Sequence, residues 1–320
     1  MILFLALAPA CQSSPLPAGD DSGTPVTQLQ APCFDGLGDG FFPDYSALGI
    51  HLPAHCHGTD LQKIDGIQRL VFLGDSVTAG TPPTPGDETY RAVLTAALTE
   101  RYGPALEVSD CSEWGARTDD LLMHEGRQIP LCFPEGGSEL RTLVVMTVGG
   151  NDMLAAAGTS DAQGPTAAQA ELTGDLALLD QALAWFKGGS DPASAHPEDS
   201  TRFPNGVFVV MGNVYEFTDG TGDLDSCALA SALGFGGKQP KLVQGYGFVD
   251  ESYMQLAVRW NVDLTLMLEN FCGHGFHAGE PGNLCYRGED AETWFDASCI
   301  HPNPTGHAQL AQMFLDTIEN

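Results

Sequence analysis

The chain has 320 residues, 43% of them apolar, which suffices for one large α/β domain with a sizeable core. Its formal net charge is −29, so nucleic acid and anionic membrane surfaces are poor partners, and we expect no nucleic-acid ligand. The acidic residues are spread along the chain, as in a solvated acidic surface.

The first residues form a short apolar run that ends in small residues, Ala8-Pro9-Ala10. The run is too short to span a bilayer and is typical of a secretory signal peptide over residues 1–10. Cys11 follows at once, which resembles a bacterial lipoprotein signal and predicts a lipidated cysteine that anchors an exported protein at the cell envelope. Two features depart from that signal, because no basic residue precedes the run and Leu7 stands one place early.

The next segment, residues 11–30, is rich in Ser, Pro, Gly, Asp and Thr and predicts a flexible tether. We expect residues 31–320 to form a single domain. Within it, residues 31–66 show no clear period and carry Cys33 and Cys56, which indicates an irregular segment stapled by a disulfide. Three histidines of this segment (His51, His55 and His57) could ligate a metal ion, but they have no regular ligand spacing.

Cysteine parity favours an oxidising compartment. The chain has nine cysteines, and without Cys11 an even number remains, which predicts disulfides in the folded domain. We expect four, with Cys272–Cys285 the most probable pair by proximity. The sequence contains no CxxC pair, so no structural zinc site is expected.

From residue 69 onward, predicted strands alternate with predicted helices. The expected strands are 69–74, 105–108, 143–148, 207–211 and 262–268, and the expected helices are 87–101, 118–127, 166–187, 241–261 and 304–318. This alternation predicts a parallel sheet with right-handed crossovers. Long glycine-rich loops at 188–206, 219–240 and 272–292 are expected to form rims or surface decoration.

Polar residues follow several of these strands. Ser76 lies just past the end of the apolar run 69–74, the segment 110–118 follows the second strand, and 149–152 follows the third. Residues 296–307 precede the last helix. Since ligands of open α/β sheets bind outside the carboxyl ends of the strands, these segments predict one shared site.

The residue types in these segments suit acyl transfer. A serine hydroxyl needs an adjacent base, and His301 can take its proton because histidine titrates near neutrality. Gly115 can offer a backbone N–H, Asn151 a side-chain amide and Ser76 its own N–H to a developing oxyanion. Simpler interpretations remain open, in which Asp75 or Ser76 caps a helix, Asn151 caps another, and Gly115 is a turn glycine.

The chain resembles the SGNH/GDSL hydrolases over about residues 68–154 and 262–320. The motifs are Gly74-Asp75-Ser76, Gly115, Gly149-Gly150-Asn151-Asp152, and His301-Pro302-Asn303 with Gly306-His307. The resemblance implies a flavodoxin-like three-layer α/β/α sandwich with a five-stranded parallel sheet in the order 2-1-3-4-5. It also implies ester hydrolysis without a metal or other cofactor. We expect a monomer, with His307 as a structural residue of the last helix.

One position departs from the family pattern. The acid usually stands three residues before the histidine, where this chain has Ser298, and Asp296 stands five residues before it. Either Asp296 reaches the imidazole through a local insertion or a backbone carbonyl orients His301. Direct contact with Asp296 predicts a severe effect of Asp296→Asn and a mild effect of Ser298→Ala.

These observations favour a secreted or lipid-anchored serine ester hydrolase, of the carboxylesterase or lipase type, with Ser76, His301 and Asp296 as catalytic residues. Ser76, Gly115 and Asn151 would form the oxyanion hole. The substrate is expected to be a small-molecule, lipid or glycan ester. The same site could serve a carbohydrate acetyl esterase or an acyltransferase, and a non-catalytic lipoprotein that binds acyl or glycan ligands is the alternative of a different class.

Overall fold

Five parallel strands form the centre of the structure, a computed structural model that describes residues 42–45, 57–122, 127–188, 201–227, 229, 237–238 and 240–319. The strands are β1 (Arg69–Gly74), β2 (Glu107–Asp110), β3 (Thr142–Thr147), β4 (Val207–Gly212) and β5 (Asp263–Thr265). Their order in the sheet is β2-β1-β3-β4-β5, which confirms the predicted order. In register, Leu70 of β1 lies beside Val108 of β2 and Leu143 of β3.

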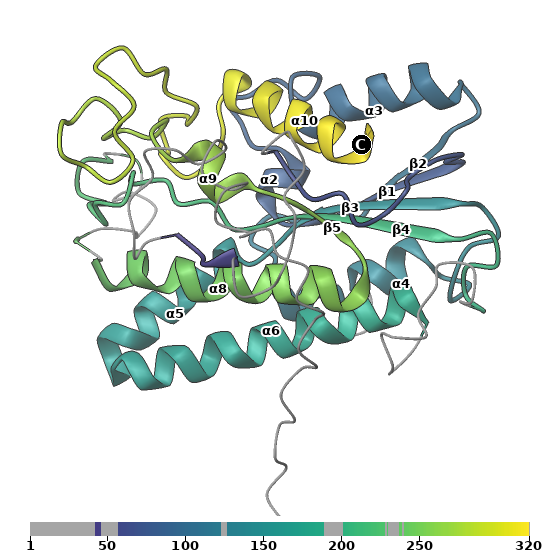
Figure 1. Ribbon diagram of the computed structural model, residues 1–320, viewed down its shortest axis with the longest axis horizontal. Coiled ribbons are helices and arrows are strands. Elements are labelled where there is room, and N and C mark those ends of the chain that lie inside the picture. The colour runs from purple at the N-terminus through teal and green to yellow at the C-terminus, as the bar shows by residue number, and fades with distance from the viewer. Residues whose placement is uncertain are drawn as a thin grey trace, which may run out of the picture.

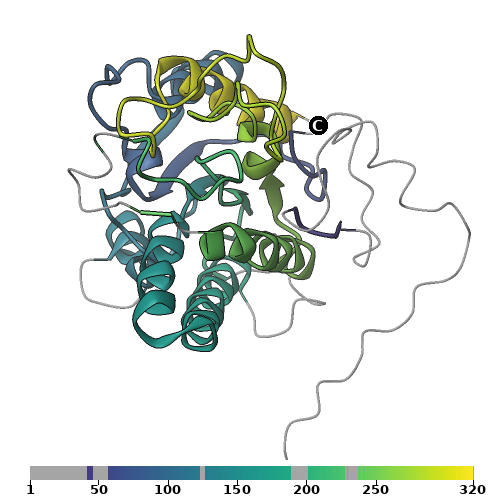
Figure 2. The same ribbon diagram turned by 90° about the vertical axis from the view of Figure 1, so that its left-hand side faces the viewer.

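Helices cover both faces of this sheet in three layers (Figures 1 and 2). One face carries α3 (Tyr90–Tyr102) and α10 (Pro304–Glu319), and the other carries α5 (Gly150–Gln163), α6 (Pro165–Lys187) and α8 (Pro240–Trp260). The shorter helices are α2 (Ser76–Ala79), the 3-10 helix η2 (Thr118–Leu121), α4 (Gln128–Cys132) and α9 (Met267–Phe271). The arrangement is the predicted α/β sandwich.

The sheet divides the interior into two apolar cores. Leu70 and Phe72 of β1 pack with α3 and α10, whereas Val71 and Leu73 pack with the helices of the opposite face. A strand that is buried on both faces has no solvated side, and this explains its uninterrupted apolar sequence. All side chains from Leu70 to Leu73 are fully buried.

Three disulfides join the described residues: Cys111–Cys132, Cys227–Cys299 and the predicted pair Cys272–Cys285. Cys33 and Cys56, like the predicted signal peptide, the tether, Cys11, His51 and His55, lie outside the described residues. In the described part of the chain, no helix combines the length and the apolar character needed to cross a membrane.

Several predicted boundaries were wrong for identifiable reasons. The second strand lies at 107–110 instead of 105–108, because it is a mostly exposed edge strand without an apolar run to mark it. Of the predicted helix 118–127, residues 118–121 form a 3-10 helix with Arg117 instead of Thr118 as N-cap and Leu122 as C-cap, and residues 123–126 lie outside the described residues. The apolar run 262–268 is divided between β5 and α9, since short buried strands and helices have similar composition.

Candidate active site

Ser76 stands where β1 ends and α2 begins. The side chain of Asp75 caps α2 by accepting a hydrogen bond from the Val77 N–H (3.0 Å). Capping is therefore the role of Asp75, and the hydroxyl of Ser76 is left for another partner. That partner is His301, whose Nε2 lies 2.9 Å from Ser76 Oγ. The structure thus brings together two predicted residues that are 225 positions apart in the sequence.

Gly74 allows the sharp turn between β1 and Ser76. Its φ is +118°, and a Cβ built on it would lie 1.9 Å from the backbone oxygen of Thr147. The buried amide of Gln128 bonds both sides of this glycine, accepting from Gly74 N (2.6 Å) and donating to Gly74 O (2.8 Å). The loop is fixed because its backbone polar groups are satisfied without water.

A series of buried, hydrogen-bonded polar side chains supports the turn that carries Ser76. Thr147 Oγ1 donates to Asp75 (2.9 Å) and lies 2.7 Å from Thr78 Oγ1, which in turn lies 2.6 Å from the Tyr90 hydroxyl. Burial raises the pKa of Asp75 to about 7, although its hydrogen bonds with Val77 and Thr147 oppose the rise. Asp75 is thus a structural carboxyl, held away from the imidazole.

The imidazole of His301 has a second neighbour at Nδ1, the hydroxyl of Ser298, at 3.2 Å. Ser298 Oγ in turn makes a close hydrogen bond to Asp296 Oδ1. Asp296 is therefore one side chain removed from the imidazole, and its predicted role stays a prediction. Burial lowers the pKa of His301, and the charge of Asp296 opposes that shift.

The residues after His301 hold its loop in place. Asn303 accepts a hydrogen bond from Gly306 N (2.8 Å) at the start of α10 and donates to the carbonyl of Thr293 (2.8 Å). His307 is fully buried, and its Nδ1 accepts from the backbone N–H of Tyr90 (3.2 Å). In this motif, His301 therefore lies at the site, whereas Asn303 and His307 have structural roles, as we expected for His307.

Asn151 lies inside α5, whose N-cap is Gly149, so the interpretation of Asn151 as a cap is wrong. Its Nδ2 donates to the carbonyl of Ala116 (2.9 Å), which fixes the turn that contains Gly115. Gly115 has φ +78°, a left-handed conformation that favours glycine. The turn interpretation of Gly115 is therefore correct, and its predicted role as an oxyanion donor stays a prediction.

An ion pair that no sequence pattern indicates supports this turn. Arg117 Nε donates to Asp152 (3.1 Å), and Asp152 also accepts from the N–H and hydroxyl of Thr118. Asp152, the last residue of the GxND motif, is nearly inaccessible to solvent. It therefore joins α5 to the 115–118 turn and does not contact the nucleophile.

A pocket opens beside Ser76 and His301. Asn151 and Asn213 contribute polar groups, and the remaining wall is mostly apolar, with Val148, Leu154, Val214, Tyr215, Phe217, Tyr246, Met267 and Ile300. Most of these side chains come from segments that follow β3, β4 and β5, at the predicted edge of the sheet. Such a wall suits the hydrocarbon part of a substrate.

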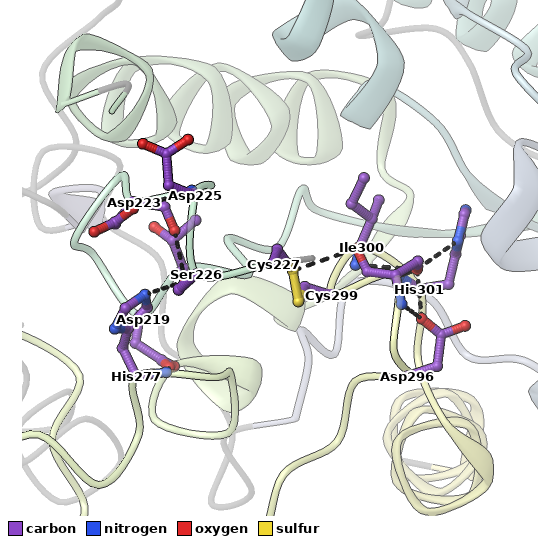
Figure 3. The surroundings of a disulfide bond; sticks show 12 residues. Asp219, Asp223, Asp225, Ser226, Cys227, His277, Asp296, Cys299, Ile300 and His301 are labelled. Atoms are coloured by element: carbon purple, nitrogen blue, oxygen red, sulfur yellow. Dashed lines mark hydrogen bonds between the residues drawn. A yellow bond between two sulfur atoms is a disulfide. The ribbon is translucent and has the colours of Figure 1, made fainter. Parts of the chain in front are cut away.

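A second serine–histidine–carboxylate group consists of Ser226, His277 and Glu280, of which Figure 3 shows Ser226 and His277. Ser226 Oγ is 2.8 Å from His277 Nε2, and His277 Nδ1 is 2.8 Å from Glu280. Burial lowers the pKa of His277, but Glu280 and Asp223 together outweigh it, so the pKa is raised. Because Ser226 donates to the carbonyl of Asp223 (3.1 Å), its hydrogen is not directed at the imidazole. This group lines no pocket described above and is a link between two rim loops.

Metal ligands show no comparable arrangement. In the residues that the structure describes, no three His, Cys, Asp or Glu side chains are grouped so that they could hold a metal ion.

Comparison with known proteins gives matches only at the level of solved structures, since no family model and no curated protein matches the chain. The extracellular lipase of Streptomyces rimosus is 20% identical, with 78% of this chain and 99% of the lipase covered and a TM-score of 0.48. A protein of Parabacteroides merdae described as a GDSL-like lipase is 15% identical (81% and 99% covered, TM-score 0.48). An acetyl xylan esterase of Geobacillus stearothermophilus is 17% identical (80% and 97% covered, TM-score 0.46). All three are likenesses of fold at low sequence identity.

Proposed function

We propose that this protein is a serine ester hydrolase of the SGNH/GDSL type. The observation that carries the proposal is the 2.9 Å contact between Ser76 Oγ and His301 Nε2 beside an apolar pocket. A serine hydroxyl at hydrogen-bond distance from a buried imidazole is the pairing that nucleophilic acyl transfer needs. The order of the motifs along the chain supports the same class.

In the proposed reaction, Ser76 Oγ attacks the acyl carbon while its proton passes to Nε2 of His301. The oxyanion accepts hydrogen bonds from the N–H groups of Ser76 and Gly115 and from Nδ2 of Asn151. The ester C–O bond then breaks, and the alcohol leaves with the proton from His301. Water then attacks the acyl-enzyme and gives a proton to His301, which passes it to Ser76 Oγ as the acyl–Oγ bond breaks, so that the acid is released and the serine is restored.

The pocket wall favours an acyl chain as the group that enters it. Buried apolar side chains around Tyr215 and Phe217 gain free energy from covering hydrocarbon, whereas a sugar ring would leave hydroxyl groups without partners there. We therefore propose carboxylic esters with an acyl chain longer than acetyl as substrates. Acetyl esters of carbohydrates and acyl transfer to another alcohol are the competing outcomes.

A panel of p-nitrophenyl esters of rising chain length, beside acetylated xylan and a phospholipid, tests the substrate class. We expect turnover to rise from acetyl to longer acyl esters. Preference for acetylated xylan would contradict the acyl pocket, and a product ester formed with added alcohol would indicate a transferase. A wild-type protein that neither turns over esters nor reacts with a fluorophosphonate would be a binding protein.

The pH profile should report the ionisation of His301. The imidazole must be neutral to accept the proton of Ser76, and burial lowers its pKa from the ordinary value of 6.5. Activity should therefore be retained as the pH falls to 6.5, and the acid limb should lie below that value. Measurement of kcat/KM against pH checks this, and an acid limb above 6.5 would contradict it.

We also propose that the protein is exported and anchored through Cys11. The disulfides Cys111–Cys132, Cys227–Cys299 and Cys272–Cys285 support an oxidising compartment, and the small residues before Cys11 support lipidation. Mass spectrometry of the native protein should find a lipid-modified Cys11 as the first residue, in the membrane fraction. An unmodified protein that begins elsewhere would contradict the anchor.

A further inference from the structure

We propose that Ser298 is a positioning residue, whose hydroxyl holds Nδ1 of His301 and connects the imidazole to the carboxylate of Asp296. The inference rests on the proposed ester hydrolase activity and concerns how its base is oriented. Ser298 stands three residues before the histidine, where the resemblance leads one to expect an acid. The hydroxyl would replace direct contact with a carboxylate.

The hydrogen bonds in this group can be assigned a direction from the nucleophile outward. Ser76 donates to Nε2 of His301, so the neutral imidazole carries its hydrogen on Nδ1. That N–H donates to Ser298 Oγ at 3.2 Å. The hydrogen of Ser298 then has to point elsewhere, and it donates to Asp296 Oδ1. Because an ionised carboxylate only accepts, it fixes the direction of every bond in the series.

The surroundings keep this series from being replaced by solvent. Ser298 is 5% exposed and Asp296 is 6% exposed. Asp296 Oδ1 also accepts from the backbone N–H of Ser298 (2.7 Å), so the carboxylate is held even when the hydroxyl is absent. Loss of the hydroxyl would leave Nδ1–H without its partner inside the protein, which is unfavourable for a buried donor.

The turn that carries these residues is closed on itself and attached to its neighbours. Asp296 N donates to His301 O (2.8 Å), and Cys299 N donates to Asp296 O (2.9 Å). Outside the turn, Cys299 forms a disulfide with Cys227, which lies between the Ser226–His277 pair and His301 (Figure 3). Tyr215 also donates to the carbonyl of Ile300 (2.7 Å). The position of Ser298 relative to the imidazole is therefore determined by the turn and its attachments.

Two separable effects follow from the arrangement. The Ser298 hydroxyl sets the tautomer and direction of the imidazole, whereas the charge of Asp296 stabilises the imidazolium and raises its pKa against the effect of burial. An asparagine at position 296 could still accept the Ser298 hydrogen through Oδ1. The expected order is thus the reverse of the order that direct contact with Asp296 predicts.

The decisive test compares Ser298→Val with Ser298→Thr, because the two side chains have nearly the same shape and only threonine keeps a hydroxyl. With a p-nitrophenyl ester, we expect Ser298→Thr to retain kcat within about threefold and Ser298→Val to lose about 10²-fold in kcat with KM unchanged. Equal kcat values for the two folded variants would overturn the inference. Ser298→Ala, assayed in the same way, covers the case in which neither larger side chain folds.

The charge effect is read from the pH profile. Asp296→Asn should lower kcat by about tenfold only, and should move the acid limb to lower pH because the imidazolium loses a neighbouring negative charge. In Ser298→Val the acid limb should stay in place. The double variant should be slower than Ser298→Val by about the loss seen in Asp296→Asn alone, since the charge of Asp296 acts on the imidazolium separately from the hydroxyl. A double variant as fast as Ser298→Val would contradict two separate effects.

These outcomes are distinct from failure of the proposed function. If the wild type neither hydrolyses esters nor becomes labelled by a fluorophosphonate at Ser76, the ester hydrolase proposal fails. If the wild type is active and Ser298→Val is active as well, only the role of Ser298 is contradicted.

Discussion

Replacement of Ser76 by alanine should lower ester turnover by about 10³-fold or more while the melting temperature stays close to that of the wild type. The loss is large because the nucleophile and the base act as a unit. Without the Ser76 hydroxyl, His301 has no nucleophile to deprotonate and no acyl-enzyme can form. The fold should persist because Asp75, and not Ser76, caps α2. The hydrogen bond described for the Ser76 side chain is the one to His301. Steady-state kinetics and a thermal melt of the same preparation measure both.

Ser226→Ala is the matched control for this variant. Ser226 also lies 2.8 Å from a histidine that contacts a carboxylate, but its own hydrogen is donated to the carbonyl of Asp223. We expect wild-type turnover in Ser226→Ala and loss of fluorophosphonate labelling only in Ser76→Ala. Near-normal activity of a folded Ser76→Ala protein, or labelling at Ser226, would refute the proposed nucleophile.

The sequence predicts those site residues whose type itself indicates their chemistry. Gly74 and Ser76 follow a buried apolar strand, which places the predicted nucleophile at the carboxyl edge of the sheet. In a parallel sheet, the loops that follow the other strands lie at the same edge. Ser76, Asn151 and His301 were therefore predictable, although they come from three distant segments. These three residues line one pocket, whereas the predicted Gly115 and Asp296 are not among its lining residues, and the catalytic roles stay predictions.

The supporting contacts were not predictable, because each depends on tertiary geometry. Gln128 is an ordinary polar residue in the sequence, yet its amide bonds both sides of Gly74, which lies 54 residues away. The backbone path of the 296–301 turn decides whether Asp296 or Ser298 contacts His301, and no periodic pattern encodes that path. Edge strand β2 lacks a strong apolar pattern for a related reason, since half of its surroundings are solvent.

Asn151→Ala should reduce kcat by roughly 10²–10³-fold with little change in KM, the loss typical of removing one oxyanion donor. The reason is that Nδ2 carries two hydrogens. One is used in the bond to the Ala116 carbonyl at 2.9 Å, and the other remains for the oxyanion that forms when Ser76 attacks. A donor that acts only on developing charge affects the transition state more than the bound substrate.

The competing structural role of Asn151 makes a different prediction. If its amide serves only to hold the Ala116 carbonyl, truncation should loosen the Gly115 turn, lower the melting temperature and change kcat by less than about threefold, well short of the loss of an oxyanion donor. The rate of fluorophosphonate labelling separates the two roles, because phosphonylation of Ser76 develops charge on an oxygen that the same donors must bind. A labelling rate that falls in parallel with kcat, at unchanged melting temperature, assigns Asn151 to the oxyanion hole. An unchanged labelling rate in a destabilised variant assigns it to the turn.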